Sequence, residues 1–216
     1  MLQQARAVET RATIISGAAN VFQTKGYLGT SMTDICAFAG VTKGALYFHF
    51  TSKEDIALAV IAAQHEASIS IVNSLRSADI SGLEALLIMS VELAKQIMND
   101  PVVSAGIRLT MEAANFSVPV ISPYTDWITV CEEFLRRAIN DGDVSPTENV
   151  ETIAHFIIPA FTGVQLVSDV LTYRQDLFRR IEEMWSVLLP ALVPAARLPL
   201  LKDLPKRVST DRLGMA

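Results

Sequence analysis

The chain has 216 residues, of which 50% are hydrophobic and 19% charged, so it can bury one large core, or one core and a small satellite domain. Its net charge of −5 is unevenly spread, because residues 1–53 carry five basic and two acidic side chains and the remainder carries 13 basic and 21 acidic ones. No 18-residue apolar run predicts a membrane span and the first residues lack a signal-peptide pattern, so a cytoplasmic protein with no membrane partner is expected.

The first quarter of the chain predicts three helices, of which the second and third are short. Apolar residues at helical spacing around Ala18 indicate a first helix that ends at Gly26, a residue suited to a left-handed helix end. The pair Thr30-Ser31 marks the start of a second helix, which stops at Gly40. A third helix is expected between Lys43 and Phe48.

The rest of the chain predicts long helices separated by turn clusters of Gly, Pro, Asn and Asp. We expect them at about 53–75, 82–98, 101–114, 122–141, 147–171 and 175–194. No segment alternates apolar and polar residues as a strand would, so the fold class is all-α. We predict a helix-turn-helix domain over 1–52, a ligand-binding and dimerisation domain over 53–196, and a loosely packed tail over 197–216.

Residues 31–50 have the spacing of a helix-turn-helix unit: a short helix, a turn at Gly40, and a second short helix. The second helix presents polar and small residues, and Lys43 can reach a phosphate or a guanine edge. The basic front of the chain agrees with a module that contacts phosphates.

These residues resemble the DNA-binding signature of the TetR family. The resemblance covers about residues 9–60 and is carried by Gly26-Tyr27, by Val-Thr-Lys-Gly-Ala-Leu-Tyr-Phe-His-Phe at 41–50, and by Ser-Lys-Glu at 52–54. It implies operator contacts from Thr30, Thr42, Lys43, Gly44, Tyr47, His49 and Lys53. Phe38 is bulkier than the residue common at its position in the family, and we expect it to pack on the edge of the module.

Some of these residues also have a purely structural interpretation. Tyr47 could belong to the core, His49 could cap or pack, and Lys53 could be a solvated residue in a first helical turn. Lys43 has the least reason to be exposed at the head of its helix unless it binds DNA.

Three segments of the second domain are similar to the γ-butyrolactone autoregulator receptors within the TetR family. They are Val102–Thr110, Pro123–Trp127 and Phe161–Ser168. The resemblance implies a repressor that a small signalling molecule of γ-butyrolactone or butenolide type releases from DNA.

Four residues are candidates for contact with that molecule. Gln64, Thr162 and Gln165 are polar residues within apolar helical runs, and Trp127 begins an apolar helix. A buried polar group without a partner costs about 1–3 kcal/mol, so each polar side chain needs a neighbour, water or a ligand. Trp127 could equally be a core residue, and the three polar side chains could bond to the backbone.

The last two long helices, 147–171 and 175–194, are too apolar to be exposed. We predict that they form a four-helix interface with a second copy. A homodimer would set two recognition helices about one turn of DNA apart on a near-palindromic operator.

Three other functions are alternatives to this one. A TetR-type regulator of efflux or detoxification genes would share the DNA-binding residues and differ in effector. An enzyme is not expected, because the common catalytic and nucleotide-binding motifs are absent. A helical module that binds protein in place of DNA fits the charge distribution poorly. The three histidines and two cysteines have no ligand spacing, so no metal or cofactor is expected, and both thiols should be buried.

Overall fold

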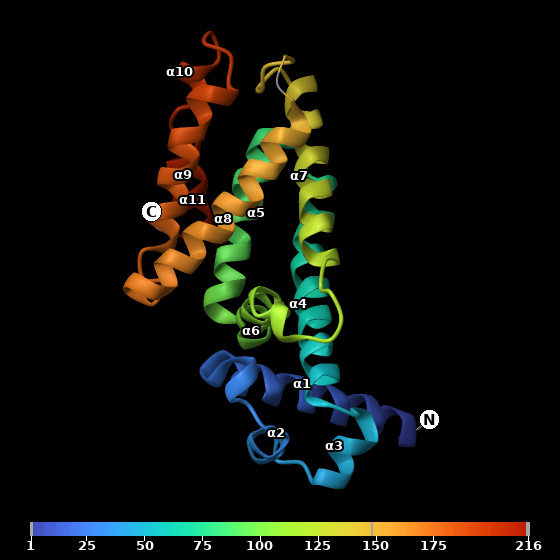
Figure 1. The fold of residues 1–216 in the computed structure, drawn as a ribbon. Helices are drawn as coiled ribbons and strands as arrows, with labels where there is room; N and C mark the ends of the chain where they lie inside the picture. The colour runs from blue at the N-terminus through green and yellow to red at the C-terminus, as the bar shows by residue number, and fades with distance from the viewer. Residues whose placement is uncertain (1, 148, 215–216) are drawn as a thin grey trace. The chain divides into compact units, whose positions relative to one another are not determined.

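The computed structural model describes residues 2–147 and 149–214, and all regular structure in these ranges is helical (Figure 1). The expected all-α fold is therefore confirmed. The helices are α1 (Leu2–Gly29), α2 (Met32–Ala39), α3 (Lys43–His49), α4 (Lys53–Arg76), α5 (Gly82–Asn99), α6 (Pro101–Met111), η1 (Ala113–Asn115), α7 (Ser122–Asn140), α8 (Val150–Thr172), α9 (Leu177–Leu192), α10 (Leu198–Leu201) and α11 (Leu204–Leu213).

The chain divides into two compact units, and the division does not follow the order of the sequence. Unit 1 comprises residues 1–69 and 96–121, and unit 2 comprises 70–95 and 122–216. The helices α1 to α3 thus share a unit with α6 and η1. The functional boundaries expected at 52/53 and 196/197 remain predictions.

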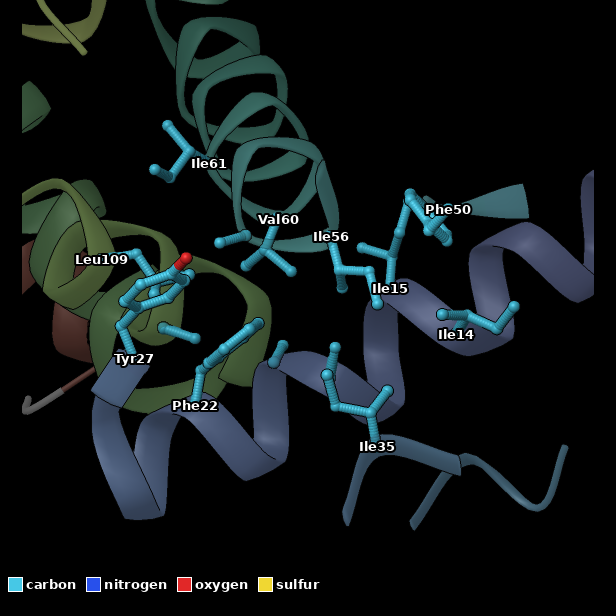
Figure 2. Close-up of a cluster of buried hydrophobic side chains, with 14 of the residues drawn as sticks. Ile14, Ile15, Phe22, Tyr27, Ile35, Phe50, Ile56, Val60, Ile61 and Leu109 are labelled. Carbon is cyan, nitrogen blue, oxygen red and sulfur yellow. The ribbon is translucent and has the colours of Figure 1, made fainter. Parts of the chain in front are cut away.

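The core of unit 1 forms where α1, α2, α4 and α6 meet. Figure 2 shows side chains from all four helices converging, among them Phe22, Ile35, Ile56 and Leu109. Each of these four side chains is fully removed from solvent, and burial of such a side chain stabilises the fold by about 1.5–3 kcal/mol.

Helix α6 lies very close to α4 within unit 1. A Cβ atom added at Gly106 would lie 2.4 Å from the Cβ of Gln64 and 3.3 Å from the carbonyl oxygen of Val60. Only a residue without a side chain permits this approach. The Arg108 side chain donates to Glu112, four residues further along α6, over 2.8 Å.

Unit 2 is built around α7, α8 and α9, with α7 packed against α8 and α8 against α9. The indole N–H of Trp185, on α9, donates to the hydroxyl of Ser90, on α5, over 3.2 Å. Both side chains are buried. This bond satisfies the one polar atom of the largest buried residue in the unit.

The C-terminal segment differs from the loose tail that we expected. Helix α11 packs against α9 and buries Leu204 and Val208. Arg197 forms an ion pair with the buried carboxylate of Asp143. Burial of these apolar residues and the pairing of the half-exposed Arg197 with Asp143 explain why residues 197–214 are ordered in spite of their prolines.

Two helices, α4 and α8, are long and apolar enough to cross a membrane by length and composition alone. Core helices of soluble proteins meet the same criterion. Both cysteines are free and buried, as expected. Burial raises the pKa of the Cys131 thiol to about 12, which makes that thiol unreactive at neutral pH.

Candidate nucleic-acid interface and effector site

Helix α2 is held at both ends by local interactions. The Ser31 hydroxyl accepts from the backbone N–H of Asp34 over 3.1 Å, and the Asp34 carboxylate accepts from the backbone N–H of Ser31 over 3.0 Å. This reciprocal capping satisfies two backbone donors. Hydrogen bonds from Lys25 and Ser31 hold the pKa of Asp34 well below its usual range. At the other end, Gly40 adopts a φ of 65° and ends the helix.

Helix α3 is short and is anchored by a few buried contacts. The Thr42 hydroxyl accepts from the backbone N–H of Ala45 over 3.1 Å and so caps the helix. Leu46 is fully buried, and Phe50, just after the helix, lies under the guanidinium of Arg11 at 5.1 Å. These contacts fix one face of α3 to the module and leave the opposite face free.

The free face of α3 carries most of the predicted operator contacts. Thr42, Lys43, Gly44 and Tyr47 are exposed, and His49 is half-buried. Because Tyr47 is 55% exposed, it is not a core residue, which removes the structural alternative considered above. The exposed groups can donate to phosphates and to base edges.

Phe48 was not among the predicted contacts, although its ring is 79% exposed on α3. The ring meets His49 edge-on, with 5.0 Å between the ring centroids. A helical projection of residues 43–49 places Phe48 beside Gly44. It was not predicted as a contact because its side chain is apolar. Phe38, expected to pack on the edge of the module, is also 60% exposed.

Thr30 and Lys53 differ from the other predicted contacts because their polar atoms already have partners. Thr30 is only 3% exposed, and its hydroxyl donates to the carbonyl of Gly26 over 2.7 Å. The ammonium of Lys53 donates to the carbonyls of Tyr27 and Thr30 over 2.7 and 2.8 Å. Their operator contacts remain predictions.

Of the four residues expected to meet an effector, Gln64 lies in unit 1 on α4. Its side-chain amide donates to the Ser68 hydroxyl over 3.0 Å, and that hydroxyl donates to the Gln96 amide oxygen over 3.1 Å. Gln96 in turn donates to the carbonyl of Ala67 over 3.1 Å. Gln64 is therefore the start of a buried polar chain, and this chain occupies the amide donor without a ligand.

The other three residues lie in unit 2, on two helices that pack together. Trp127 is nearly buried on α7, and Thr162 is half-buried on α8, where its hydroxyl donates to the carbonyl of Ile158 over 3.0 Å. Gln165, also on α8, is 2% exposed, yet its amide oxygen has no hydrogen-bond partner among the described residues. Of the four, it has the strongest need for a partner that the chain itself does not provide.

Helices α8 and α9 present apolar side chains to solvent. Val170, Leu171 and Val187 are all more than 60% exposed. A shallow groove of about 340 Å³ runs between the two helices. It is lined by Phe156, Ala160, Val164, Arg180, Glu183, Met184, Val187 and Leu188. Exposed apolar surface of this extent marks an interaction site.

Within residues 2–147 and 149–214, no group of three or more His, Cys, Asp or Glu side chains could hold an ion.

Two family models match the chain. Residues 14–60 match the model described as bacterial regulatory proteins, tetR family, and residues 80–194 match the model described as Tetracyclin repressor-like, C-terminal domain. The second match covers more than half of the chain. Together they include the helix-turn-helix unit and most of unit 2.

Among curated relatives, the A-factor receptor protein of Streptomyces griseus is 36% identical over 192 residues, covering 89% of this chain and 67% of that protein. Among solved structures, a γ-butyrolactone receptor described as ArpA-like has a TM-score of 0.82 at 35% identity, covering 95% of this chain and 99% of that one. The TetR family protein CprB of Streptomyces coelicolor, solved with its operator sequence, has a TM-score of 0.78 at 34% identity, with the same coverage of both chains.

The helix-turn-helix geometry agrees with all three comparisons: the two family models, a relative that matches most of the chain, and a solved structure that is similar along almost its full length. They also exclude a catalytic role, since these relatives are transcriptional regulators. The chain belongs to the TetR family, and it is a DNA-binding transcriptional repressor.

Proposed function

We propose that the chain acts as a homodimer on a near-palindromic operator in the cytoplasm, and that a γ-butyrolactone or butenolide signal releases it. The relatives described as A-factor and γ-butyrolactone receptors support the class of effector. They also favour this function over a regulator of efflux or detoxification genes.

In this proposal α3 enters the major groove of the operator. Lys43 donates to a phosphate or a guanine, while Thr42 and Tyr47 donate to phosphates. Gly44 lets the backbone approach the DNA, and His49 lies at the C-terminal end of the free face of α3. Phe48 adds an apolar surface suited to a thymine methyl group.

The second copy covers the exposed face of α8 and α9. Burial of Val170, Leu171 and Val187 removes apolar side chains from water, which favours association. An interface of α8 and α9 with their copies is a four-helix arrangement. It holds the two recognition helices at the spacing that a two-fold symmetric operator requires.

The buried, unpartnered amide oxygen of Gln165 is the observation that carries the effector proposal. An effector hydroxyl can donate to this oxygen, while Trp127 supplies apolar area and Thr162 a hydroxyl. Gln64, which lies in unit 1, is proposed separately as an effector contact through the part of its amide not bonded to Ser68. Small amphiphilic lactones combine the polar and apolar groups that such a site needs.

Release follows if the effector binds one conformation of the dimer better than the other. The effector then shifts the population toward a state whose recognition helices no longer match the operator spacing. The shift cannot exceed the difference in affinity between the two states.

The proposal is tested by selecting operator duplexes with the purified protein from a randomised pool. The selected duplex is then titrated in a gel-shift assay with γ-butyrolactones, butenolides, alkylfuran acids and a set of drug-like cations. Release by lactones or butenolides alone supports the proposal. Release by the cations alone would establish the efflux-type alternative, and failure to select any duplex at low salt would contradict DNA binding by this chain.

A further inference from the structure

The ammonium group of Lys53 lies in a site made by the turn between α1 and α2. It donates to the carbonyl oxygens of Tyr27 and Thr30, over 2.7 and 2.8 Å. It also lies 4.4 Å from the centroid of the Tyr27 ring, a cation–π contact. Two of its three donors are thus used inside the protein, and an aromatic face covers it.

Other residues of unit 1 also hold the backbone and the ring that surround Lys53. The backbone N–H of Tyr27 donates to the Glu112 carboxylate over 2.7 Å. The ring of Phe116 meets Tyr27 edge-on at 4.6 Å. Gly26 has a φ of 68°, and its carbonyl accepts from the Thr30 hydroxyl. The turn therefore has a defined shape, and Lys53 is one of several groups that maintain it.

This turn determines where the helix-turn-helix unit lies relative to α4. Thr30 is followed directly by Ser31, the capping residue of α2. Helix α2 packs against α1 and α3. Lys53 is the first residue of α4, so its two hydrogen bonds join the start of α4 to the start of α2.

A phosphate contact would compete with these bonds. Two of the three N–H donors are held by carbonyls and the Tyr27 ring covers one side of the ammonium, so only the third N–H could meet a phosphate where it stands. A longer reach toward DNA would break both bonds and leave the carbonyl of the buried Thr30 without its charged donor. Lys43 faces no such cost, because it is exposed at the head of α3.

We propose that Lys53 is a positioning residue for operator binding, which holds the helix-turn-helix unit against α4, and that it does not bind a phosphate as the resemblance implied. The inference rests on the proposed binding of DNA through α3. In this proposal Lys43 neutralises a phosphate, and Lys53 fixes the geometry of the helix-turn-helix unit.

The salt dependence of DNA binding separates these roles. Each phosphate contact contributes about 0.9 to the slope of log K against log salt, so loss of one contact per subunit lowers the slope of a dimer by about 1.8. Affinities of wild type, Lys53→Met and Lys43→Met are measured from 50 to 200 mM KCl on a duplex selected from a randomised pool. Circular dichroism at the same temperature verifies that each variant is folded.

For Lys53→Met we expect about a tenfold loss of affinity with an unchanged slope, because loss of both internal hydrogen bonds lowers the population of the arrangement that binds DNA. Lys53→Gln, which keeps uncharged donors, should recover part of the affinity. Lys43→Met should lower the slope. A lower slope for Lys53→Met, or an unchanged affinity, would overturn the inference. Failure of wild type to bind any duplex would instead contradict the proposed function.

A measurement on the wild-type protein covers the case in which Lys53→Met does not fold. Lysine acetylation by acetic anhydride is followed by mass spectrometry, with and without the selected duplex. We expect slow modification of Lys53 in both samples, and rapid modification of Lys43 that DNA suppresses. Rapid modification of Lys53 in the free protein, suppressed by DNA, would show a phosphate contact.

Discussion

The free face of α3 and the exposed apolar surface of α8 and α9 present side chains to solvent for opposite physical reasons. On α3 the exposed residues are polar, small or aromatic and lie on seven residues anchored by Leu46. On α8 and α9 the exposed residues include several large apolar side chains: Phe156, Leu166, Val167, Val170, Leu171 and Val187. The first surface suits a polar, charged polymer, and the second suits a surface like itself.

Exposure alone does not identify a partner, whereas the chemistry of the exposed side chains does. Lys43 can neutralise a phosphate and contributes nothing to the core, so its exposure is explained by DNA. Val187 gains nothing from water, so its exposure is explained by another apolar surface. The following changes test each side of this comparison.

The largest effect is expected at the α8–α9 surface from Val187→Glu. Val187 is 78% exposed and borders the groove between the helices. An unpaired charge buried at an interface costs several kcal/mol, so dimerisation should weaken at least about 100-fold and operator binding should be lost with it. Light scattering after size exclusion gives the mass, and a gel shift gives the affinity.

Leu200→Glu is the matched control for Val187→Glu. Leu200 is 69% exposed on α10, in the same unit but away from the groove. It should leave mass and affinity unchanged. A dimeric Val187→Glu protein that binds DNA normally would show that α9 does not form the interface.

The next effect is expected from Trp127→Ala in the effector site. Loss of a large aromatic contact with the effector costs about 2 kcal/mol or more. The effector concentration for half-release should therefore rise about 30-fold, while DNA affinity in the absence of effector stays the same. A gel-shift titration with the effector measures both quantities.

Trp185→Phe controls for the loss of an indole elsewhere in unit 2. Trp185 bonds to Ser90 in the core, so its replacement should lower stability without changing the response to effector. If Trp127→Ala responds normally and loses about 3–5 kcal/mol of stability, then Trp127 is a core residue, and the effector assignment is wrong.

The recognition unit could be predicted in detail because its determinants are local. The cap at Ser31 and the helix end at Gly40 involve residues within a few positions of each other, and the structure confirms both. At Gly26 the backbone leaves the helical conformation (φ 68°), but α1 continues to Gly29. Resemblance to the TetR family added the partner. It did not single out Phe48, although Phe48 follows Gly44 by four residues and so lies on the same exposed face of α3.

Other features depend on contacts between distant parts of the chain. The partners of Lys53 are carbonyls 23 and 26 residues away, and the order of the C-terminal segment depends on burial of Leu204 and on the pairing of Arg197 with Asp143. No periodicity predicts such contacts. The Gln64–Ser68 bond was predictable, because the two residues lie four apart on one helix.

Replacing a glycine by alanine should have opposite effects on stability in the tightly packed helix α6 of unit 1 and on the open face of α8 in unit 2. Gly106→Ala places a Cβ atom 2.4 Å from the Cβ of Gln64, so it should destabilise the protein by about 1–3 kcal/mol. Gly163→Ala, on α8, meets no atom within 4 Å. It should stabilise the helix by about 0.5–1 kcal/mol.

Thermal unfolding of both glycine variants measures this difference. Equal effects would contradict the close approach of α6 to α4. A loss of dimer stability in Gly163→Ala, seen as a stronger dependence of the unfolding temperature on protein concentration, would instead show that a second copy covers that part of α8.

The smallest effect is expected from the two buried glutamines, which receive the same substitution. Gln64→Met removes the donor to Ser68 and should lower stability by about 1 kcal/mol. Gln165→Met removes an amide oxygen that has no partner among the described residues, so the free energy of unfolding should stay constant or rise by up to about 1 kcal/mol. Urea unfolding without effector measures both.

The response to effector then decides why Gln165 is retained. If its oxygen accepts a hydrogen bond from the effector, Gln165→Met should raise the concentration for half-release about tenfold, equivalent to one hydrogen bond. A variant that is more stable and still releases DNA normally would leave the unpartnered oxygen unexplained. A variant that is more stable but insensitive would show that the unpaired amide is kept at a cost in stability because it binds the signal.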